Sequence, residues 1–242
     1  MIVYILIIAH LLADFTFQST SLAKNKAEQF KYLAVHAFIY AIVFAAPILL
    51  FVGLARGSFL YVCIIVSHFL IDWIRQIIEK KGLSKGFVFA LFIFDQMIHI
   101  LIIILLVSLL KIETHTNAIY AYAQTWVHFR TFIIYALTLT VIWEPTAVLI
   151  KRLFIYILDE NTNDNDEGDP KIGRMIGKLE RLLISALVLC NQLGAIGFVL
   201  TAKSIARYKQ LEDKAFAEKY LVGTLASTAI SFMVAMFLKS IV

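Results

Sequence analysis

The sequence predicts an all-α fold of the polytopic integral membrane class, with about seven transmembrane helices. Hydrophobic residues make up 61% of the 242 positions, whereas charged residues make up only 16%. Soluble domains contain about 25% charged residues, so this balance favours a membrane. Three long runs, 32–55, 182–202 and 221–238, contain no Asp, Glu, Lys or Arg. Each run is close to the roughly 20 residues that a helix needs to cross the hydrocarbon core of a bilayer.

Four further stretches contain only a few ionisable residues and complete the set of predicted spans. In chain order the expected helices cover residues 1–17, 32–55, 57–78, 86–110, 130–157, 182–202 and 221–238. Helices are expected because a chain in lipid must satisfy its own backbone hydrogen bonds, and the alternating pattern of a membrane β-barrel is absent. The first stretch lacks the basic start and the cleavage site of a signal peptide, so it is expected to remain as a short helix.

A polar stretch in the middle of the chain divides the predicted helices into two units. Residues 1–111 are expected to form a four-helix membrane unit, residues 112–129 an extracytoplasmic connection, and residues 130–242 a three-helix membrane unit. The connection contains Tyr and Trp residues, which favour the membrane interface. The second unit includes the acidic stretch 159–171, which predicts a solvated loop.

Basic residues in the loops predict the orientation of the chain. Lys24, Lys26 and Lys31 follow the first predicted helix, and four more basic residues lie around the turn after the third, whereas the loop between the second and third has only Arg56. By the positive-inside rule, the N-terminus is expected outside and the C-terminus inside. The segment 203–219 carries five basic residues but would then be external. It is therefore either an interfacial amphipathic helix, or the helix count in the second half is wrong.

Histidine and aspartate residues recur at one spacing inside the first four predicted helices. Three pairs lie four positions apart: His10 and Asp14, His68 and Asp72, and, in reversed order, Asp95 and His99. Residues at i and i+4 lie on one face of a helix, so each pair presents both side chains to the same point. The fourth helix runs opposite to the first and third, and the reversed order therefore keeps like residues at the same depth. His36, from the second helix, is expected to join them.

This arrangement predicts a layered cluster in the cytoplasmic half of residues 1–111, with aspartates nearest the cytoplasmic face and histidines one turn deeper. A single buried His or Asp can serve as an interhelical hydrogen bond worth about 1 kcal/mol. A cluster of such residues is harder to explain by hydrogen bonds alone, because each buried carboxylate destabilises the fold by several kcal/mol unless a positive partner compensates its charge. We therefore expect a divalent metal ion, zinc before manganese or iron. The predicted ligands are His10, Asp14, His36, His68, Asp72, Asp95 and His99. A proton relay or a structural hydrogen-bond network is the alternative.

Other polar residues suggest supporting roles. Gln18 and Gln96 are placed to orient ligands or a bound water. In the second half of the chain, Lys203 and Arg207 lie four positions apart. This spacing suits a lipid phosphate at the membrane interface, with snorkelling cations as the alternative interpretation.

Several motifs carry a resemblance to a known family: HLLADFTFQ at 10–18, the lysine after it, His36, SHFLID at 67–72 and DQMIH at 95–99. On these motifs, which cover roughly the first 110 residues, the chain resembles a bacterial inner-membrane family of unknown function, the 3307 series. Three later strings, GRMIGKLER, TAKSIAR and EKYLVGTLAS, resemble an extension found in some members. The resemblance implies a multi-pass protein of the inner (plasma) membrane, and it implies no activity.

The site chemistry instead predicts a membrane-embedded metal-dependent hydrolase that acts on a lipid or lipid-linked substrate. A zinc-class ion lowers the pKa of a bound water towards about 7, and an aspartate that does not bind the ion can act as general base. Asp14, Asp72 and Asp95 are the candidates for that role. The alternatives are a metal-ion or proton transporter or channel, and a membrane anchor or sensor with a structural metal site. Membrane lipids are the expected partners, nucleic acid is not expected, and a homo-oligomer is left open.

Overall fold

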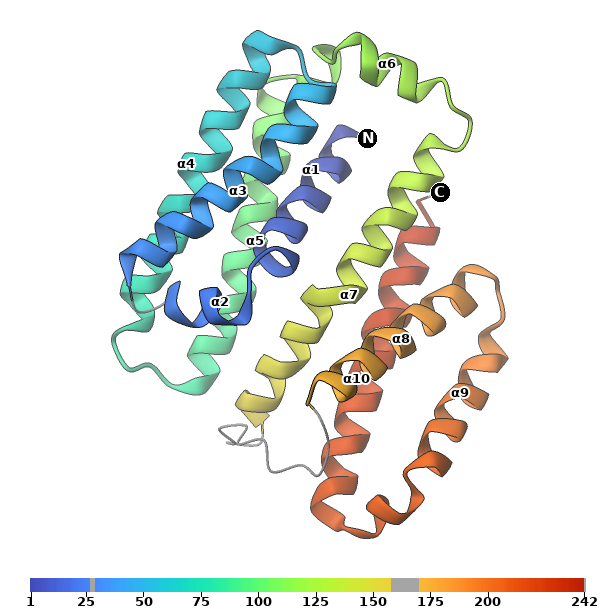
Figure 1. The fold of residues 1–242 in the computed structure, drawn as a ribbon. Coiled ribbons are helices and arrows are strands. Elements are labelled where there is room, and N and C mark those ends of the chain that lie inside the picture. Colours follow the sequence, from blue (N-terminus) through green and yellow to red (C-terminus); the bar gives the residue numbers. More distant parts are fainter. Residues whose placement is uncertain (27–28, 158–169, 242) are drawn as a thin grey trace. The chain divides into compact units, whose positions relative to one another are not determined.

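The computed structural model describes residues 1–26, 29–157 and 170–241, which form helices joined by turns. The chain divides into two compact units, Met1–Leu137 and Thr138–Val242. The boundary between them lies inside the helix α7 (Phe129–Ile157), shown in yellow-green in Figure 1. The predicted all-α class is confirmed for the described part of the chain.

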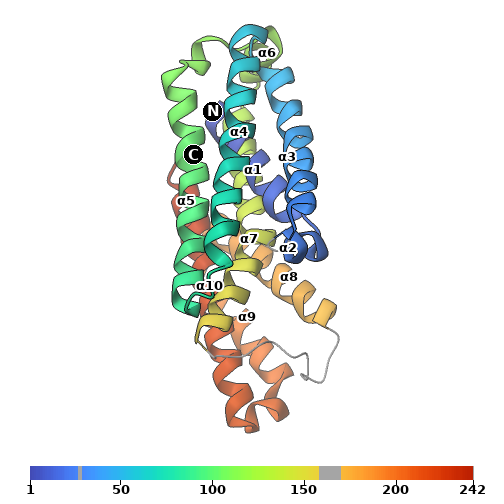
Figure 2. The same cartoon turned by 90° about the vertical axis from the view of Figure 1, so that its left-hand side faces the viewer.

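The first unit is a bundle of long helices with a shorter helix packed against it. Its elements are α1 (Ile2–Leu11), the π-helical turn η1 (Leu12–Thr16), α2 (Thr20–Lys26), α3 (Phe30–Phe51), α4 (Leu54–Glu79), α5 (Lys85–Leu109), the 3-10 turn η2 (Ile112–Thr114), α6 (Ala118–Gln124) and the start of α7. Figure 2 shows α3, α4 and α5 side by side along their length. The short α1 packs against both α3 and α5, and α2 lies against α3.

The core of this unit is apolar towards one end of the bundle and polar towards the other. Leu6, Phe44, Ile64 and Ile103 are among the fully or almost fully buried hydrophobic residues. The opposite faces of the long helices expose large apolar side chains, such as Phe38 on α3. Exposed apolar faces of this kind are suited to lipid, where burial from water comes from the bilayer itself.

Five described helices are long and apolar enough to cross a membrane: α3, α4, α5, α7 and α10 (Lys214–Lys239). The chain is therefore a multi-pass membrane protein, although the predicted number of seven spans is not confirmed. The helical segment Ile2–Thr16 combines ten residues of α1 with five of η1. At about 1.5 Å per residue it is shorter than the roughly 30 Å hydrocarbon core.

The predicted span over 182–202 is wrong as a single helix. The chain forms α8 (Pro170–Leu189) and α9 (Leu193–Ala206) on either side of a turn. Asn191 in that turn has a φ of 60°, in the left-handed region that ends helices. The absence of charged residues over 182–202 therefore did not predict the helix boundary. The uncharged but polar pair Asn191–Gln192 lies where the helix ends.

The second unit contains the rest of α7 together with α8, α9, the 3-10 turn η3 (Tyr208–Glu212) and α10. Helix α8 packs against α10. Lys239 near the end of α10 donates from Nζ to the carbonyl oxygens of Val188 and Leu189 and to Oδ1 of Asn191. A cation at this place adds hydrogen bonds to carbonyl groups at the C-terminal end of α8, where the helix dipole favours positive charge.

Pro145 removes one backbone hydrogen bond of α7, and side chains contact the carbonyl oxygens around it. Proline has no N–H, so the carbonyl oxygen of Val141 loses its usual donor. The Thr146 hydroxyl donates to that oxygen at 2.8 Å. The buried Arg181 donates from Nε to the carbonyl oxygen of Ile142 at 2.6 Å and from Nη2 to that of Trp143 at 3.0 Å. Arg181 therefore stabilises the helix around its proline.

We predict that Arg181→Ala destabilises the protein, because it removes the two hydrogen bonds that this buried side chain donates to carbonyl groups of α7. We expect a decrease in the free energy of unfolding of about 2 kcal/mol, which a lower midpoint of thermal unfolding in detergent would reveal. Lys209→Ala, which changes an exposed residue of the same unit, serves as the control. Equal midpoints for the two variants would contradict the role given to Arg181.

Candidate metal centre

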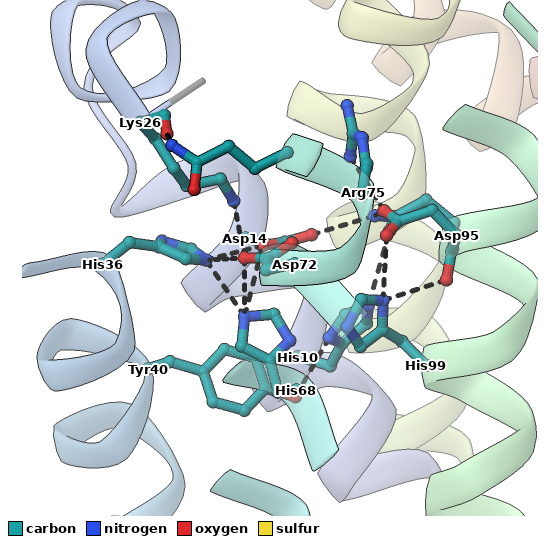
Figure 3. Close-up of polar contacts among 12 residues, drawn as sticks. His10, Asp14, Lys26, His36, Tyr40, His68, Asp72, Arg75, Asp95 and His99 are labelled. Atoms are coloured by element: carbon teal, nitrogen blue, oxygen red, sulfur yellow. Dashed lines mark hydrogen bonds and ion pairs between the residues drawn. The ribbon is translucent and has the colours of Figure 1, made fainter. Parts of the chain in front are cut away.

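Four helical segments bring the predicted ligands together in the polar part of the first unit (Figure 3). Helix α1 supplies His10, η1 supplies Asp14, α3 supplies His36, α4 supplies His68 and Asp72, and α5 supplies Asp95 and His99. All seven residues are buried, with exposed fractions between 0% and 7%. The i and i+4 spacing on α4 and on α5 therefore does place each His and Asp pair towards the centre of the bundle.

Asp14, His36, His68 and Asp72 form the first ligand group, whose ligand atoms lie within 4.8 Å of one another. Nε2 of His36 is 3.0 Å from Nε2 of His68, 3.0 Å from Oδ1 of Asp14 and 3.3 Å from Oδ2 of Asp72. Nε2 of His68 is 3.8 Å and 3.4 Å from the same two oxygens. Four ligands about 2.0–2.1 Å from a tetrahedral ion would be about 3.3 Å apart. The five separations, from 3.0 to 3.8 Å, are close to this value, so the group could hold an ion of this kind.

Asp72, Asp95 and His99 form a second ligand group, which shares Asp72 with the first. Nδ1 of His99 donates to the backbone carbonyl oxygen of Asp95 at 2.9 Å. This bond places the proton on Nδ1 and leaves the lone pair on Nε2, which has no hydrogen-bond partner among the described residues. A backbone carbonyl that fixes the tautomer in this way is a common feature of histidines that bind metals.

His10 lies beside both groups but belongs to neither. The amide nitrogen of Gln96 donates to Oδ2 of Asp14 at 2.9 Å and to Oδ2 of Asp95 at 3.1 Å. Its oxygen therefore faces Nε2 of His10, at 3.3 Å, and accepts the proton of that nitrogen. Nδ1 of His10 then accepts from the Tyr40 hydroxyl at 3.1 Å. Because both of its nitrogens have partners, His10 positions Gln96 and Tyr40 in this arrangement.

Two cations contact the carboxylates on the side away from the imidazoles of His10, His68 and His99 (Figure 3). Lys26 at the end of α2 donates to Oδ2 of Asp72 at 2.8 Å. Arg75 donates to Oδ2 of Asp95 at 2.8 Å and to Glu79 at 2.9 Å. The side chain of Gln76 donates to the backbone carbonyl of Lys26 at 2.9 Å, which holds the end of α2 against α4.

Sequence reasoning missed Tyr40 and Arg75 as parts of the site and treated Lys26 as a loop cation. The Tyr40 ring is stacked on the His68 ring at 3.6 Å with an interplanar angle of 7°. The sequence spacing could have indicated that both residues belong to the site. Tyr40 lies four positions after His36, and Arg75 lies three positions after Asp72. Both therefore share a helix face with a predicted ligand.

The turn that carries Asp14 is a π-helix, which the sequence did not predict. Residues Leu12–Thr16 form η1 directly after α1. A π-turn contains more residues than an α-helical turn, so it changes the direction of Asp14 relative to His10, and such turns are frequent at functional sites. Asp14 approaches His36 and His68, whereas His10 contacts Tyr40 and Gln96.

The residues predicted to hold a lipid phosphate lie in the second unit. Lys203 Nζ donates to Oε2 of Glu180 at 2.6 Å and to the Thr224 hydroxyl at 2.9 Å. Its charge is therefore compensated within the protein. Arg207 lies over the Phe216 ring. The predicted acidic loop at 159–171 falls almost entirely outside the described residues.

The chain belongs to the family described as "Protein of unknown function (DUF3307)", whose model matches residues 2–129. The resemblance predicted from the motifs is thereby confirmed. No curated protein and no solved structure matches the chain. All members of both ligand groups lie inside the matched residues, together with Lys26, Tyr40, Arg75 and Gln96.

We predict that Gln96→Leu weakens divalent-metal binding, because Gln96 holds one oxygen of Asp14 and one of Asp95. Loss of such a supporting residue lowers metal affinity by about 10–100-fold. The measurement is a zinc titration in competition with a chelator. Met97→Leu, next along α5 and exposed, is the control and should bind as the wild type does. Equal affinities for the two variants would show that Gln96 does not support the ligands.

Proposed function

We propose that this protein is a membrane-embedded metal-dependent hydrolase whose zinc-class ion is held by the first ligand group. The observation that carries the proposal is the convergence of two imidazole nitrogens and two carboxylate oxygens from η1, α3 and α4 at separations of 3.0–3.8 Å. The coarser conclusion, a buried His and Asp cluster able to hold a metal ion, follows directly from this geometry.

The burial of these groups supports an ion at their centre. Carboxylates and neutral imidazoles direct lone pairs at the same point, and in a medium of low dielectric constant such groups repel each other strongly. Lys26 contacts one oxygen of Asp72, yet Oδ1 of Asp72 has no hydrogen-bond donor among the described residues. Oδ1 of Asp14 faces Nε2 of His36 at 3.0 Å, and both atoms belong to the first ligand group. A divalent cation compensates several ligands at once, and imidazole with carboxylate is a usual ligand set for zinc.

Hydrolysis is the chemistry that such an ion supports best. When bound, the ion would supply a water acidic enough to lose a proton near neutral pH. An aspartate oxygen of the cluster that does not hold the ion would accept the proton of the water that attacks the carbonyl carbon or phosphorus of the substrate. The bond to the leaving oxygen or nitrogen then breaks as that atom receives the proton.

The position of the site supports a lipid or lipid-linked substrate. His36 is the seventh residue of α3, and Asp72 lies seven residues before the end of α4, so both are about 10 Å from the same end of the bundle. Lys80, Lys81 and Lys85 lie in or beside the α4–α5 turn at that end. By the positive-inside rule, we assign this end to the cytoplasmic side of the inner membrane, within reach of lipid head groups.

The apolar core gives less support to a transporter for metal ions or protons. Between the cluster and the other end of the bundle, the described interior is lined by side chains such as Leu6, Phe44 and Ile64. An ion that crosses this region would lose its hydration without gaining ligands. A structural metal site in an anchor or sensor uses the same ligands and differs only in having no turnover.

We predict that purified protein contains a stoichiometric divalent metal and that His68→Ala and Asp72→Ala remove it, since both residues supply ligand atoms. Element analysis measures this content. His128→Ala, which changes an exposed histidine outside the cluster, is the matched control and should retain the metal. Wild-type metal content in both ligand variants would leave only a hydrogen-bonded core.

Activity separates the three functions that share this site. We expect the metal-loaded protein to hydrolyse a member of a panel of lipid esters, amides and phosphoesters, with loss on chelation and recovery on addition of zinc. Ion flux into liposomes that disappears in His68→Ala would instead establish transport. A metal-replete protein with neither turnover nor flux would favour the structural site and rule out the hydrolase.

A further inference from the structure

Each residue of the second ligand group keeps one ligand atom without a hydrogen-bond partner. These atoms are Oδ1 of Asp72, Oδ1 of Asp95 and Nε2 of His99. The three residues are each only 3% exposed. Buried polar atoms normally have partners, because an unpaired one costs about 1–3 kcal/mol. The three residues each bring a ligand atom within 4.8 Å of those of the other two. Their unpaired atoms therefore indicate a ligand that supplies positive charge.

Protein donors already occupy the other atoms of these residues. Arg75 and Gln96 hold Oδ2 of Asp95, and the backbone carbonyl of Asp95 accepts from Nδ1 of His99. In metal sites, a hydrogen bond usually holds one atom of each ligand side chain, and the other atom of that side chain remains available to the metal. The second group therefore has the organisation of a metal site as well as the residue types.

Asp72 connects the two groups through its two oxygens. Oδ2 faces the first group, at 3.3 Å from Nε2 of His36 and 3.4 Å from Nε2 of His68. Oδ1 is the atom that remains for the second group. A carboxylate that binds one ion through each oxygen holds two ions at the short separation found in two-metal phosphatases and nucleases, about 3.5–4 Å.

We propose that the second ligand group binds a second divalent ion, bridged to the first by Asp72, and that the resulting two-ion centre acts on a phosphoester. This inference rests on the proposed function and specifies its substrate class. The first ion would have four protein ligands, so a water that it activates would have to be a fifth ligand. The second ion has three, so it keeps an open position for water or substrate, as catalytic zinc sites do.

Charge favours a phosphoester over a neutral ester or amide. The groups in contact within the cluster carry four negative and two positive charges, from Asp14, Asp72, Glu79 and Asp95 against Lys26 and Arg75. One divalent ion therefore neutralises the cluster, whereas two leave an excess of two positive charges in a buried site. A phosphate group neutralises that excess, and by linkage phosphate and the second ion strengthen each other's binding.

The test counts zinc ions per chain in the full protein in detergent, by equilibrium dialysis and element analysis, with and without inorganic phosphate. We expect the wild type to bind one ion tightly and a second whose affinity phosphate raises about tenfold. We expect His99→Ala to bind one ion at every phosphate concentration. Asp95→Asn keeps the side-chain volume and should behave in the same way, and His128→Ala should behave as the wild type does.

Three outcomes overturn the inference in distinguishable ways. One ion per wild-type chain at all phosphate concentrations removes the second site and leaves the first group and the hydrolase intact. Loss of both ions in His99→Ala and Asp95→Asn, with helix content unchanged by circular dichroism, means that a single site uses all these ligands. A wild type that binds no zinc removes the proposed function as well.

Discussion

The burial of three carboxylates among four imidazoles is the constraint on which the first unit depends. Asp14, Asp72 and Asp95 lie in the interior of a bundle whose outer faces are apolar. In such an environment a charge without a partner is costly, and the cost rises as water is excluded. The helices α1, α3, α4 and α5 can therefore pack closely only if cations or hydrogen-bond donors meet these oxygens. The structure supplies Lys26, Arg75 and Gln96, and it leaves other buried atoms of the cluster, which could hold a metal ion, without a hydrogen-bond partner.

Several features of the fold serve this one requirement. The π-turn η1 directs Asp14 towards α3 and α4, and Gln76 holds the end of α2 so that Lys26 reaches Asp72. The stacked rings of Tyr40 and His68 fix the imidazole plane. Residues that orient ligands contribute to metal affinity almost as directly as the ligands do. The centre is therefore built from a layer of ligands and a surrounding layer of supports, both contained in the residues that define the family.

The second unit deals with buried charge by pairing it within the protein. Glu144 accepts from Arg174 at 2.5 Å and from Lys178, and Glu180 accepts from Lys203. Arg181 has a different role, since it donates to carbonyl oxygens beside Pro145. No group of three or more His, Cys, Asp or Glu residues able to hold a metal was found in the described residues of this unit.

The sequence by itself determined the class of fold and the membrane, and it predicted seven candidate ligands, six of which lie in the two ligand groups. Long charge-free runs require helices in lipid, and the i and i+4 spacing on opposed helices places like residues at one depth, so these features depend only on local geometry. Tertiary structure alone decided how the ligands divide into two groups, why His10 belongs to neither, and which cations approach the carboxylates. It also decided that 182–202 is broken at Asn191. These features depend on rotation about each helix axis, on a π-turn and on contacts between residues distant in sequence, none of which hydropathy or spacing encodes.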